Sequence, residues 1–142
     1  MRFAYPAAFE PEDGGYVVSF RDVPGASTEG DDEAEALAEA QDALVVALGH
    51  YIERRLPLPE PSPPRPGERP VPVPSLIAAK LALYEAMLAA GLSRSGLARK
   101  LGIAETAAAR LPALHHRSHI GEVERALAAL GKRLEVAVRD VA

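Results

Sequence analysis

The stretch HHRSH places His115, His116 and His119 within five residues of one another, close enough in sequence to share a proton or a metal ion. Imidazole binds transition metals and exchanges protons near neutral pH, so a metal centre or a general base is the first chemistry to consider. The chain has no cysteine, and no obvious carboxylate completes a zinc site. We therefore expect no metal here, and interpret the stretch as a polar loop or as a place where His116 and Arg117 meet phosphate.

Carboxylates form a second group that could do chemistry. Six acids in the N-terminal part could in principle hold the two metal ions of a nuclease: Glu10, Glu12, Asp13, Asp22, Asp31 and Asp32. Most of them lie in expected turns or at an expected helix start, where local structure already accounts for an acid. No pattern marks a nucleophile or a general base. We predict that the chain is not an enzyme and uses no cofactor, with a metal-dependent nuclease as an alternative.

The stretch SRSGLARKLGI, residues 93–103, has the residue types of a short helix followed by a tight turn. Ser93 suits a helix N-cap, Ala98 lets a second helix cross closely, and Gly102 suits the turn. Five apolar residues would hold two helices to a common core: Leu97, Leu101, Ile103, Ala108 and Leu111. This spacing predicts a helix-turn-helix, whose second helix, AETAAARL, would enter the major groove of DNA.

The charge around this motif favours DNA as the ligand over a purely helical core or dimerisation domain. Five lysines and arginines and one acid lie between Ser93 and Arg117. Arg110 could donate to a guanine, and Glu105 could accept from the amino group of a cytosine. Pro112 should end the second helix early, so we expect modest specificity per half-site and binding as a dimer. The predicted DNA-binding residues are Ser93, Arg94, Arg99, Lys100, Glu105, Thr106, Arg110, His116 and Arg117.

Alternating apolar residues predict β-strands at the start of the chain. Every second residue of residues 3–9 and 16–20 is apolar, as in strands with one buried face. The intervening EPEDGG suits a hairpin turn, because glycine accepts positive φ without strain. VPGAST then indicates a turn before a short third strand.

A long helix should follow within residues 30–56. Asp31 or Asp32 can cap its first turn, and Glu35 can complete a capping box. Helical spacing puts one apolar stripe on Ala34, Leu37, Ala38, Leu44, Val45, Leu48, Tyr51 and Ile52. This helix would lie on the antiparallel strands, so we predict an α+β domain over residues 1–58.

Nine of the thirteen prolines lie between Leu56 and Pro74. Proline lacks a backbone donor and disfavours helix in the residue before it, so residues 59–74 are predicted to be an extended linker between two domains. Part of this linker, Arg69 to Val73, could pair at a sheet edge, where proline is tolerated.

Helical patterns dominate residues 75–142, which we predict to be an all-α helix-turn-helix domain with a C-terminal strand. Ser75 should cap its first helix, and HIGEVERALAAL should form its last. The final RLEVAVRDV alternates as a strand does but would have no partner in a helical domain. We expect it to pair with a second copy, which predicts a homodimer or a higher even-numbered oligomer.

The charge of the chain differs between its two parts. Residues 1–59 contain 4 lysines and arginines against 12 acids, whereas residues 60–142 contain 12 against 8. An acidic first part suits a basic partner, and a basic second part suits DNA. No apolar run reaches the roughly 18 residues of a membrane span. The N-terminus lacks the apolar core of a signal peptide, so we expect a cytoplasmic protein with no membrane contact.

The N-terminal part contains a set of short motifs in a fixed order: a Gly-Gly hairpin, then Y-x-V-x-F-x-D-x-P-G, then G-D before a helix that begins with E-A-L. The residues that form them are Gly14, Gly15, Tyr16, Val18, Phe20, Asp22, Pro24, Gly25, Gly30, Asp31, Glu35, Ala36 and Leu37. This pattern resembles that of the HicB-type antitoxins of HicA/HicB toxin–antitoxin systems. VPSLIAAKLALYEAM and LARKLGI resemble the C-terminal helix-turn-helix that many members contain.

This resemblance implies a fold and partners that composition does not show. The first part would have a degenerate RNase H-like fold without nuclease activity, and its partner would be a HicA-type toxin, a small basic mRNA-cleaving protein. HicB-type proteins bind and block that toxin, and those with a DNA-binding part also repress their own operon. The toxin would meet the acidic face of residues 1–59, where the candidate contacts are Glu10, Asp13, Asp22 and Glu29.

A stand-alone transcriptional regulator is the alternative function. In that protein the α+β part would sense a small ligand or a partner, and the helix-turn-helix would bind DNA. A ligand sensor predicts an enclosed apolar pocket within residues 1–60, whereas a toxin-binding part predicts a filled core and an exposed acidic face.

Overall fold

The alternating residues at the start of the chain form a β-hairpin in the computed structural model, which describes residues 2–141. Strands β1 (Ala4–Glu12) and β2 (Gly15–Phe20) pair antiparallel from Ala7↔Phe20 to Glu12↔Gly15. The two turn residues, Asp13 and Gly14, have φ of 49° and 82°. Both lie in the left-handed region that a two-residue hairpin turn with the right twist requires. The predicted hairpin is confirmed.

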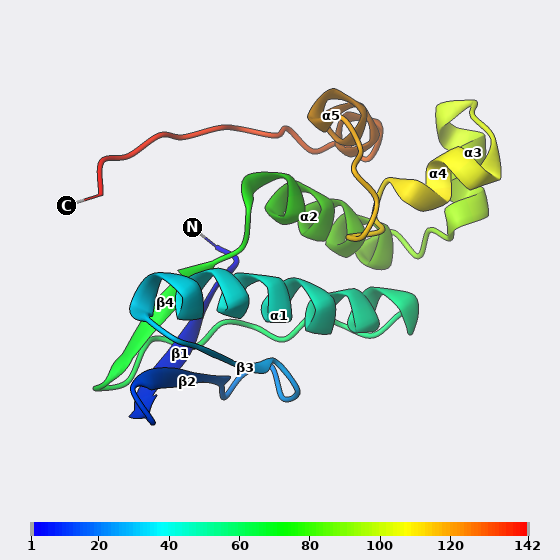
Figure 1. Cartoon of the computed structure of the whole chain (residues 1–142). Helices are drawn as coiled ribbons and strands as arrows, with labels where there is room; N and C mark the ends of the chain where they lie inside the picture. The colour runs from blue at the N-terminus through cyan, green and yellow to red at the C-terminus, as the bar shows by residue number, and fades with distance from the viewer. Residues whose placement is uncertain (1, 142) are drawn as a thin grey trace.

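Two further strands complete a four-stranded sheet in the order β3-β2-β1-β4 (Figure 1). The predicted third strand is β3 (Ser27–Gly30), antiparallel to β2. Strand β4 (Glu68–Pro72) comes from the proline-rich segment and pairs antiparallel with β1 at the opposite edge. A Cβ on Gly30 would overlap the backbone of Ala36, so this glycine lets the following helix begin directly against β3.

That helix, α1 (Glu33–Glu53), begins as predicted. The Asp32 side chain accepts a hydrogen bond from the Glu35 backbone N–H at 2.8 Å, and the Glu35 carboxylate accepts from the Asp31 N–H at 3.3 Å. The predicted apolar stripe is partly wrong, because Ala34 and Ala38 are exposed. The buried face consists of Ala36, Ala40, Leu44, Ala47, Leu48 and Ile52. Alanine fits either face of a helix, so the close approach to β3 decides which alanines are buried.

The first hydrophobic core lies between the sheet and α1. Tyr5, Val18, Leu44 and Leu48 are completely buried there. Helix α2 (Ser75–Ala89) also contributes to this core, through Ile77, Leu81 and Tyr84. The sheet and α1 therefore do not form a core of their own but share it with the first helix of the C-terminal part.

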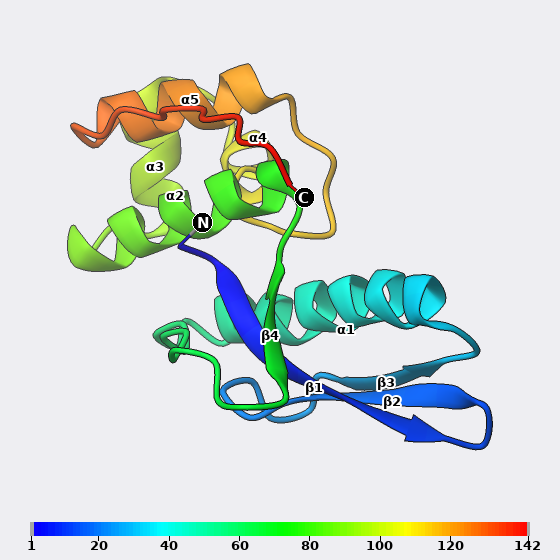
Figure 2. The same cartoon turned by 90° about the vertical axis from the view of Figure 1, so that its left-hand side faces the viewer.

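The second core lies on the other side of α2, against α3 (Arg94–Leu101), α4 (Glu105–Arg110) and α5 (Ile120–Ala129). Figure 2 shows α2 between α1 and α5. Residues Ala79, Leu83, Ala86 and Met87 of α2 belong to this second core. Because α2 is covered on two sides, its sequence is apolar nearly all round rather than striped.

Helix α2 begins one residue earlier than predicted, because Pro74 is its N-cap and Ser75 is its first residue. No side chain caps this helix; Pro74 is extended, with φ −57° and ψ 151°. Within residues 2–141, no single helix has the length and hydropathy to cross a membrane. Helices α2 and α3 meet those criteria only when taken together, and they are bent by 100° from one another.

Hydrogen bonds fix the proline-rich segment to the sheet and to α2. The Tyr5 hydroxyl donates to the Pro59 carbonyl at 2.8 Å, and the Tyr84 hydroxyl donates to the Leu56 carbonyl at 2.6 Å. Burial raises the pKa of both hydroxyls, as expected for phenols that remain neutral donors. The segment is thus anchored where it leaves α1.

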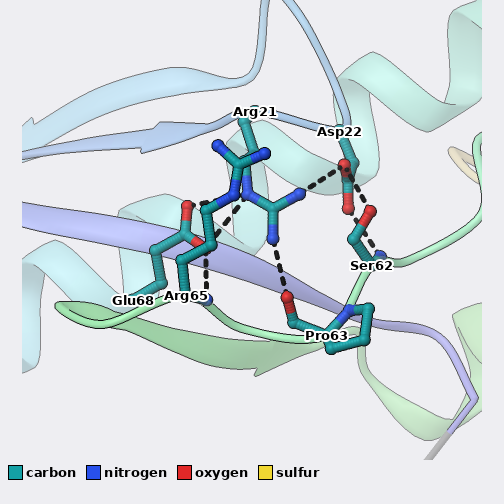
Figure 3. A network of polar contacts seen from close by, with 6 residues as sticks. All are labelled: Arg21, Asp22, Ser62, Pro63, Arg65 and Glu68. Atoms are coloured by element: carbon teal, nitrogen blue, oxygen red, sulfur yellow. Dashed lines mark hydrogen bonds and ion pairs between the residues drawn. The ribbon is translucent and has the colours of Figure 1, made fainter.

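A polar network holds the middle of the same segment (Figure 3). The backbone N–H and the hydroxyl of Ser62 donate to the Asp22 carboxylate at 2.7 and 3.0 Å. Arg21 donates to the Pro63 carbonyl at 2.7 Å and to both carboxylate oxygens of Glu68. The Arg65 backbone N–H and then Arg21 hold the pKa of Glu68 below its ordinary value. The segment predicted as an extended linker follows one defined path.

The predicted C-terminal strand does not form in the single chain. Residues 132–141 have no regular secondary structure, and Figure 1 shows them extending from α5 with no strand beside them. Val136 and Val138 are 80% and 93% exposed. A strand needs a hydrogen-bonded neighbour, and the sheet within the described residues has β3 and β4 at its edges, neither of which pairs with this segment.

Candidate nucleic-acid interface

Two short helices joined by a tight turn occupy residues 94–110, as the spacing predicted. Ser93 is the N-cap of α3, and its hydroxyl accepts a hydrogen bond from the Gly96 backbone N–H at 3.0 Å. Gly102 ends α3 with φ 67°, a left-handed conformation that strains residues with a Cβ. Helix α4 begins at Glu105, with Ala104 as its N-cap, so Gly102 and Ile103 form the turn. Helices α3 and α4 are therefore separate elements.

The apolar residues predicted to hold the two helices are buried, with one exception. Leu97, Ala98, Ala108 and Leu111 are buried in the second core, and Leu101 packs against it. Ile103 is 40% exposed, so the prediction that it belongs to the core is wrong. Its backbone N–H donates to the Ala98 carbonyl at 3.0 Å, which closes the end of α3. Ile103 contributes to the turn through its backbone rather than through its side chain.

Lys80 of α2 is a buried residue that sequence reasoning missed. Its ammonium group donates to the Arg110 carbonyl at 2.9 Å, to the Ala113 carbonyl at 2.7 Å and to the Ser118 hydroxyl at 3.0 Å. Burial lowers the pKa of Lys80 to about 8. A single lysine within the apolar run LIAAKLALY was the available signal, because a charge on a helix covered on both sides must find partners inside.

The contacts of Lys80 explain how the chain accommodates Pro112. Helix α4 ends at Arg110, as Pro112 predicted, and this end leaves backbone carbonyls without helical partners. Lys80 supplies donors to two of the carbonyls around this end, those of Arg110 and Ala113. The end of α4 is therefore fixed to α2 by a buried cation.

The structure separates most of the predicted DNA-binding residues into two groups. Eight of the nine are exposed, and His116 is half-buried. Arg99 and Lys100 lie at the end of α3, close in sequence to the exposed start of α4 with Glu105 and Thr106. Arg94 and Arg110 form the other group, and they line a groove of about 430 Å³ between α1 and the C-terminal part. Ser93, the N-cap of α3, and His116 and Arg117, in the loop before α5, line no part of this groove.

The histidines and the N-terminal acids do not gather into a metal site. No group of three or more histidine, aspartate or glutamate side chains could hold a metal ion within residues 2–141. His119 is the N-cap of α5, where its backbone N–H donates to the Glu122 carboxylate at 3.3 Å. Asp22 accepts from Ser62, and Asp32 caps α1. These acids have structural partners, which gives no support to the nuclease alternative.

The acids predicted to meet a toxin differ in their accessibility. Glu10, Asp13 and Glu29 are exposed, on β1, in the hairpin turn and on β3. Asp22 is half-buried, and its two oxygens accept hydrogen bonds from Ser62 and Arg21. Three of the four candidates are therefore free to meet a partner, and Asp22 serves the fold.

Comparison with known proteins matches the chain to one family. A family described as "HicB_like antitoxin of bacterial toxin-antitoxin system" matches residues 4–82, which include the sheet, α1 and the start of α2. The chain belongs to the HicB family of antitoxins. It is 46% identical over 132 residues to Antitoxin HicB 2 of Photorhabdus laumondii, covering 93% of this chain and 94% of that protein.

Other HicB relatives match over nearly the whole chain. Antitoxin HicB of Escherichia coli K12 is 39% identical over 133 residues, covering 93% of this chain and 96% of that protein. Antitoxin HicB of Pseudomonas fluorescens is 34% identical over 139 residues, covering 97% and 95%. Membership in this family implies a toxin partner and a regulatory role.

Proposed function

We propose that this HicB-family chain binds and neutralises a HicA-type toxin, a small basic mRNA-cleaving protein, through residues 1–58. The exposed acids on β1, the hairpin turn and β3 support this assignment, together with the excess of acids over residues 1–59. A ribonuclease presents cations where it binds RNA, so an acidic surface attracts that face and competes with RNA for it. The chain would act by covering the toxin, without catalysis and without a cofactor.

Residues 75–142 would bind the operator of the chain's own operon and repress it. The observation that supports this part is the α3–turn–α4 geometry, with Arg99 and Lys100 exposed beside it. Helix α4 would lie in the major groove, and the surrounding cations would meet phosphates. Residues 59–74 would connect the two parts, and the protein would act in the cytoplasm, where mRNA and operon lie.

The operator-binding form would be a homodimer or a higher even-numbered oligomer. Helix α4 has only six residues, so one copy reads few bases. The unpaired segment at residues 132–141 would pair with its equivalent in a second copy. Two α3–turn–α4 units held in this way would reach two half-sites.

Co-purification tests the antitoxin part of this proposal. The chain is expressed together with its flanking genes, and the expected result is a small basic protein that elutes with it. Adding the chain to that purified protein should suppress cleavage of an mRNA substrate. If the chain elutes alone and still shifts its promoter DNA, the stand-alone regulator is correct instead.

Promoter binding tests the repressor part. Arg99→Ala with Lys100→Ala should weaken binding and reduce the slope of log K against log salt by roughly 2, because each phosphate contact contributes about 0.9. Arg54→Ala with Arg125→Ala removes the same charge from exposed positions outside the predicted DNA interface and outside the segment at residues 132–141, and should leave the slope unchanged. Equal slopes for the two double variants would show that α3 does not meet phosphate.

The groove between β3 and α1 bears on the regulator alternative. It is lined by β3 and the residues just before it, and by α1 and the residues just after it. Its volume is about 610 Å³, but it is open to solvent. The core of the same region is filled by side chains such as Tyr5, Val18 and Leu44. This arrangement suits a protein partner better than an enclosed small ligand.

A further inference from the structure

Strand β3 leaves one edge of the sheet open. It is the outermost strand beside β2, and within residues 2–141 its residues Ser27 to Gly30 pair only on that side. Alternate residues of an edge strand direct their N–H and C=O groups away from the sheet, where another strand can pair with them. Figure 1 shows no further strand beyond β3.

The opposite edge is closed to such pairing. Strand β4 contains Pro70 and Pro72 among its five residues, and proline has no N–H to donate. The side chain of Gln41 also donates to the Pro72 carbonyl at 2.9 Å. Of the two edges, β3 is therefore the one that can accept a further strand.

A groove accompanies the open edge. Ser27 and Thr28 of β3 form one wall, and α1 with the residues after it forms the other. Val46 and Leu56 both line this groove and are 61% and 43% exposed, so it offers two large apolar side chains to a partner. A strand added to β3 would cover them with every second side chain.

The charges at the groove indicate what kind of strand it accepts. Glu39 and Asp42 line it beside β3, and Glu29 lies on β3 itself, whereas His50 and Arg54 line it where α1 ends. The part of the groove next to β3 is therefore acidic. A second copy paired through this edge would place these acids near their own equivalents, which disfavours self-association here. A strand with lysine or arginine side chains would be attracted instead.

We propose that the toxin adds an extended strand to the open edge of β3, with basic side chains against Glu39 and Asp42 and apolar ones over Val46 and Leu56. The inference rests on the proposed antitoxin function and names the surface that performs it. Main-chain hydrogen bonds would give affinity, and the groove would select the sequence of the strand.

Two sets of variants locate the binding surface. Glu39→Lys with Asp42→Lys should weaken binding of the co-purified basic protein by about tenfold or more, and Val46→Lys should do the same, as expected for central interface residues. Glu60→Lys with Glu124→Lys makes the same change in net charge at exposed positions outside the groove and outside the acidic strands, and should have a much smaller effect. Thermal unfolding of each variant confirms that the chain is folded.

Hydrogen exchange tests strand addition itself. Binding of the basic protein should slow exchange of the outward-facing amides in residues 27–30 by about tenfold or more, as new backbone hydrogen bonds do. Amides of Arg69 and Val71 in β4 serve as the control and should not change. A contact through side chains alone would leave the β3 amides unprotected and would overturn strand addition.

The outcomes separate this inference from the function beneath it. If the chain binds and inhibits the basic protein but the groove variants bind it as tightly as the wild type does, the groove is wrong and the antitoxin function stands. If β3 amides are already protected at high concentration of the chain alone and lose protection on dilution, a second copy occupies the edge instead. If the wild-type chain binds no basic protein, both proposals fail together.

Discussion

At the scale of single residues, Lys80 joins separate parts of the molecule. It lies on α2, yet its three hydrogen bonds reach the end of α4 and the loop before α5. A buried ammonium is costly unless its donors are all used, and here three protein acceptors use them. The orientation of α4 therefore depends on a residue outside α3 and α4.

The lowered pKa of Lys80 predicts a pH dependence of stability. Below pH 8 the lysine is charged in the folded and the unfolded chain, so the full cost of burying the charge is present. Between about 8 and its ordinary 10.5, the folded chain has released a proton that the unfolded chain retains. The contribution of Lys80 to the free energy of unfolding therefore rises with pH in this window.

Urea unfolding of the wild type and of Lys80→Met between pH 7 and 9.5 measures this effect. The difference in the free energy of unfolding, wild type minus variant, should increase with pH. The tyrosines Tyr5 and Tyr84 have raised pKa values and act in the opposite direction, but only above about pH 10, where free tyrosine titrates. A difference that is constant with pH would contradict the assignment.

At the scale of elements, the turn between α3 and α4 depends on the conformation of Gly102. Its φ of 67° lies in the left-handed region, and no heavy atom lies within 4 Å of a Cβ built on it. A substitution there meets backbone strain but no clash. A substitution at Gly102 therefore measures the cost of backbone strain without an added effect on packing.

Gly102→Ala should lower the free energy of unfolding by about 1 kcal/mol, because alanine is strained at positive φ. Gly121→Ala is the matched control, since Gly121 lies in α5 with open space around it and no positive φ. It should be neutral or slightly stabilising. Chemical denaturation of both variants measures the change in the free energy of unfolding. Equal changes would mean that the positive φ at residue 102 does not require glycine.

Much of the element order follows from local sequence signals. The sequence alone predicted the alternating residues of β1 and β2, the Asp32 cap of α1, and the boundaries of α3 at Ser93 and Gly102. Each of these features depends on residues that are close together in the chain. The exposure of Ala34, Ala38 and Ile103 could not be predicted in this way, because it depends on which distant element covers each side chain. The RNase H-like relationship of residues 1–58 stays a prediction.

The candidate site was predictable in its residue types but not in its grouping. The spacing indicated the helix pair, yet nothing local showed that Arg94 and Arg110 line a groove beside α1. Lys80 was missed because its partners lie at least 30 residues away in sequence. The contacts of β4 and of the proline-rich segment are equally distant, and only tertiary packing determines them.

At the scale of the whole molecule, the exposed segment after α5 predicts the assembly. Val136 and Val138 are apolar residues at alternate positions with no cover in the single chain. Pairing with a second copy would bury them and satisfy the backbone, as strand pairing does elsewhere. The oligomer and the operator affinity should therefore be lost together.

Ala137→Pro with Val138→Pro tests this expectation. Consecutive strand residues donate to opposite sides, so one of the two prolines removes a donor on the pairing side whichever way the strand faces. Light scattering should show a monomer, and the promoter shift should need a much higher protein concentration. The control is Glu135→Ala, which keeps every backbone donor, so this variant should remain an oligomer. If the control were a monomer, pairing would not be through the backbone.

The position of α2 between two cores limits how the gene can recombine. A join at residue 75 would separate Ile77 and Tyr84 from the sheet core that they complete. A join after α2 would keep that core but leave Leu83 and Met87 facing whatever domain was attached. A foreign C-terminal domain can replace the residues after α2 only if it brings an apolar face that covers Leu83 and Met87, so we expect the two parts of this protein to be exchanged together.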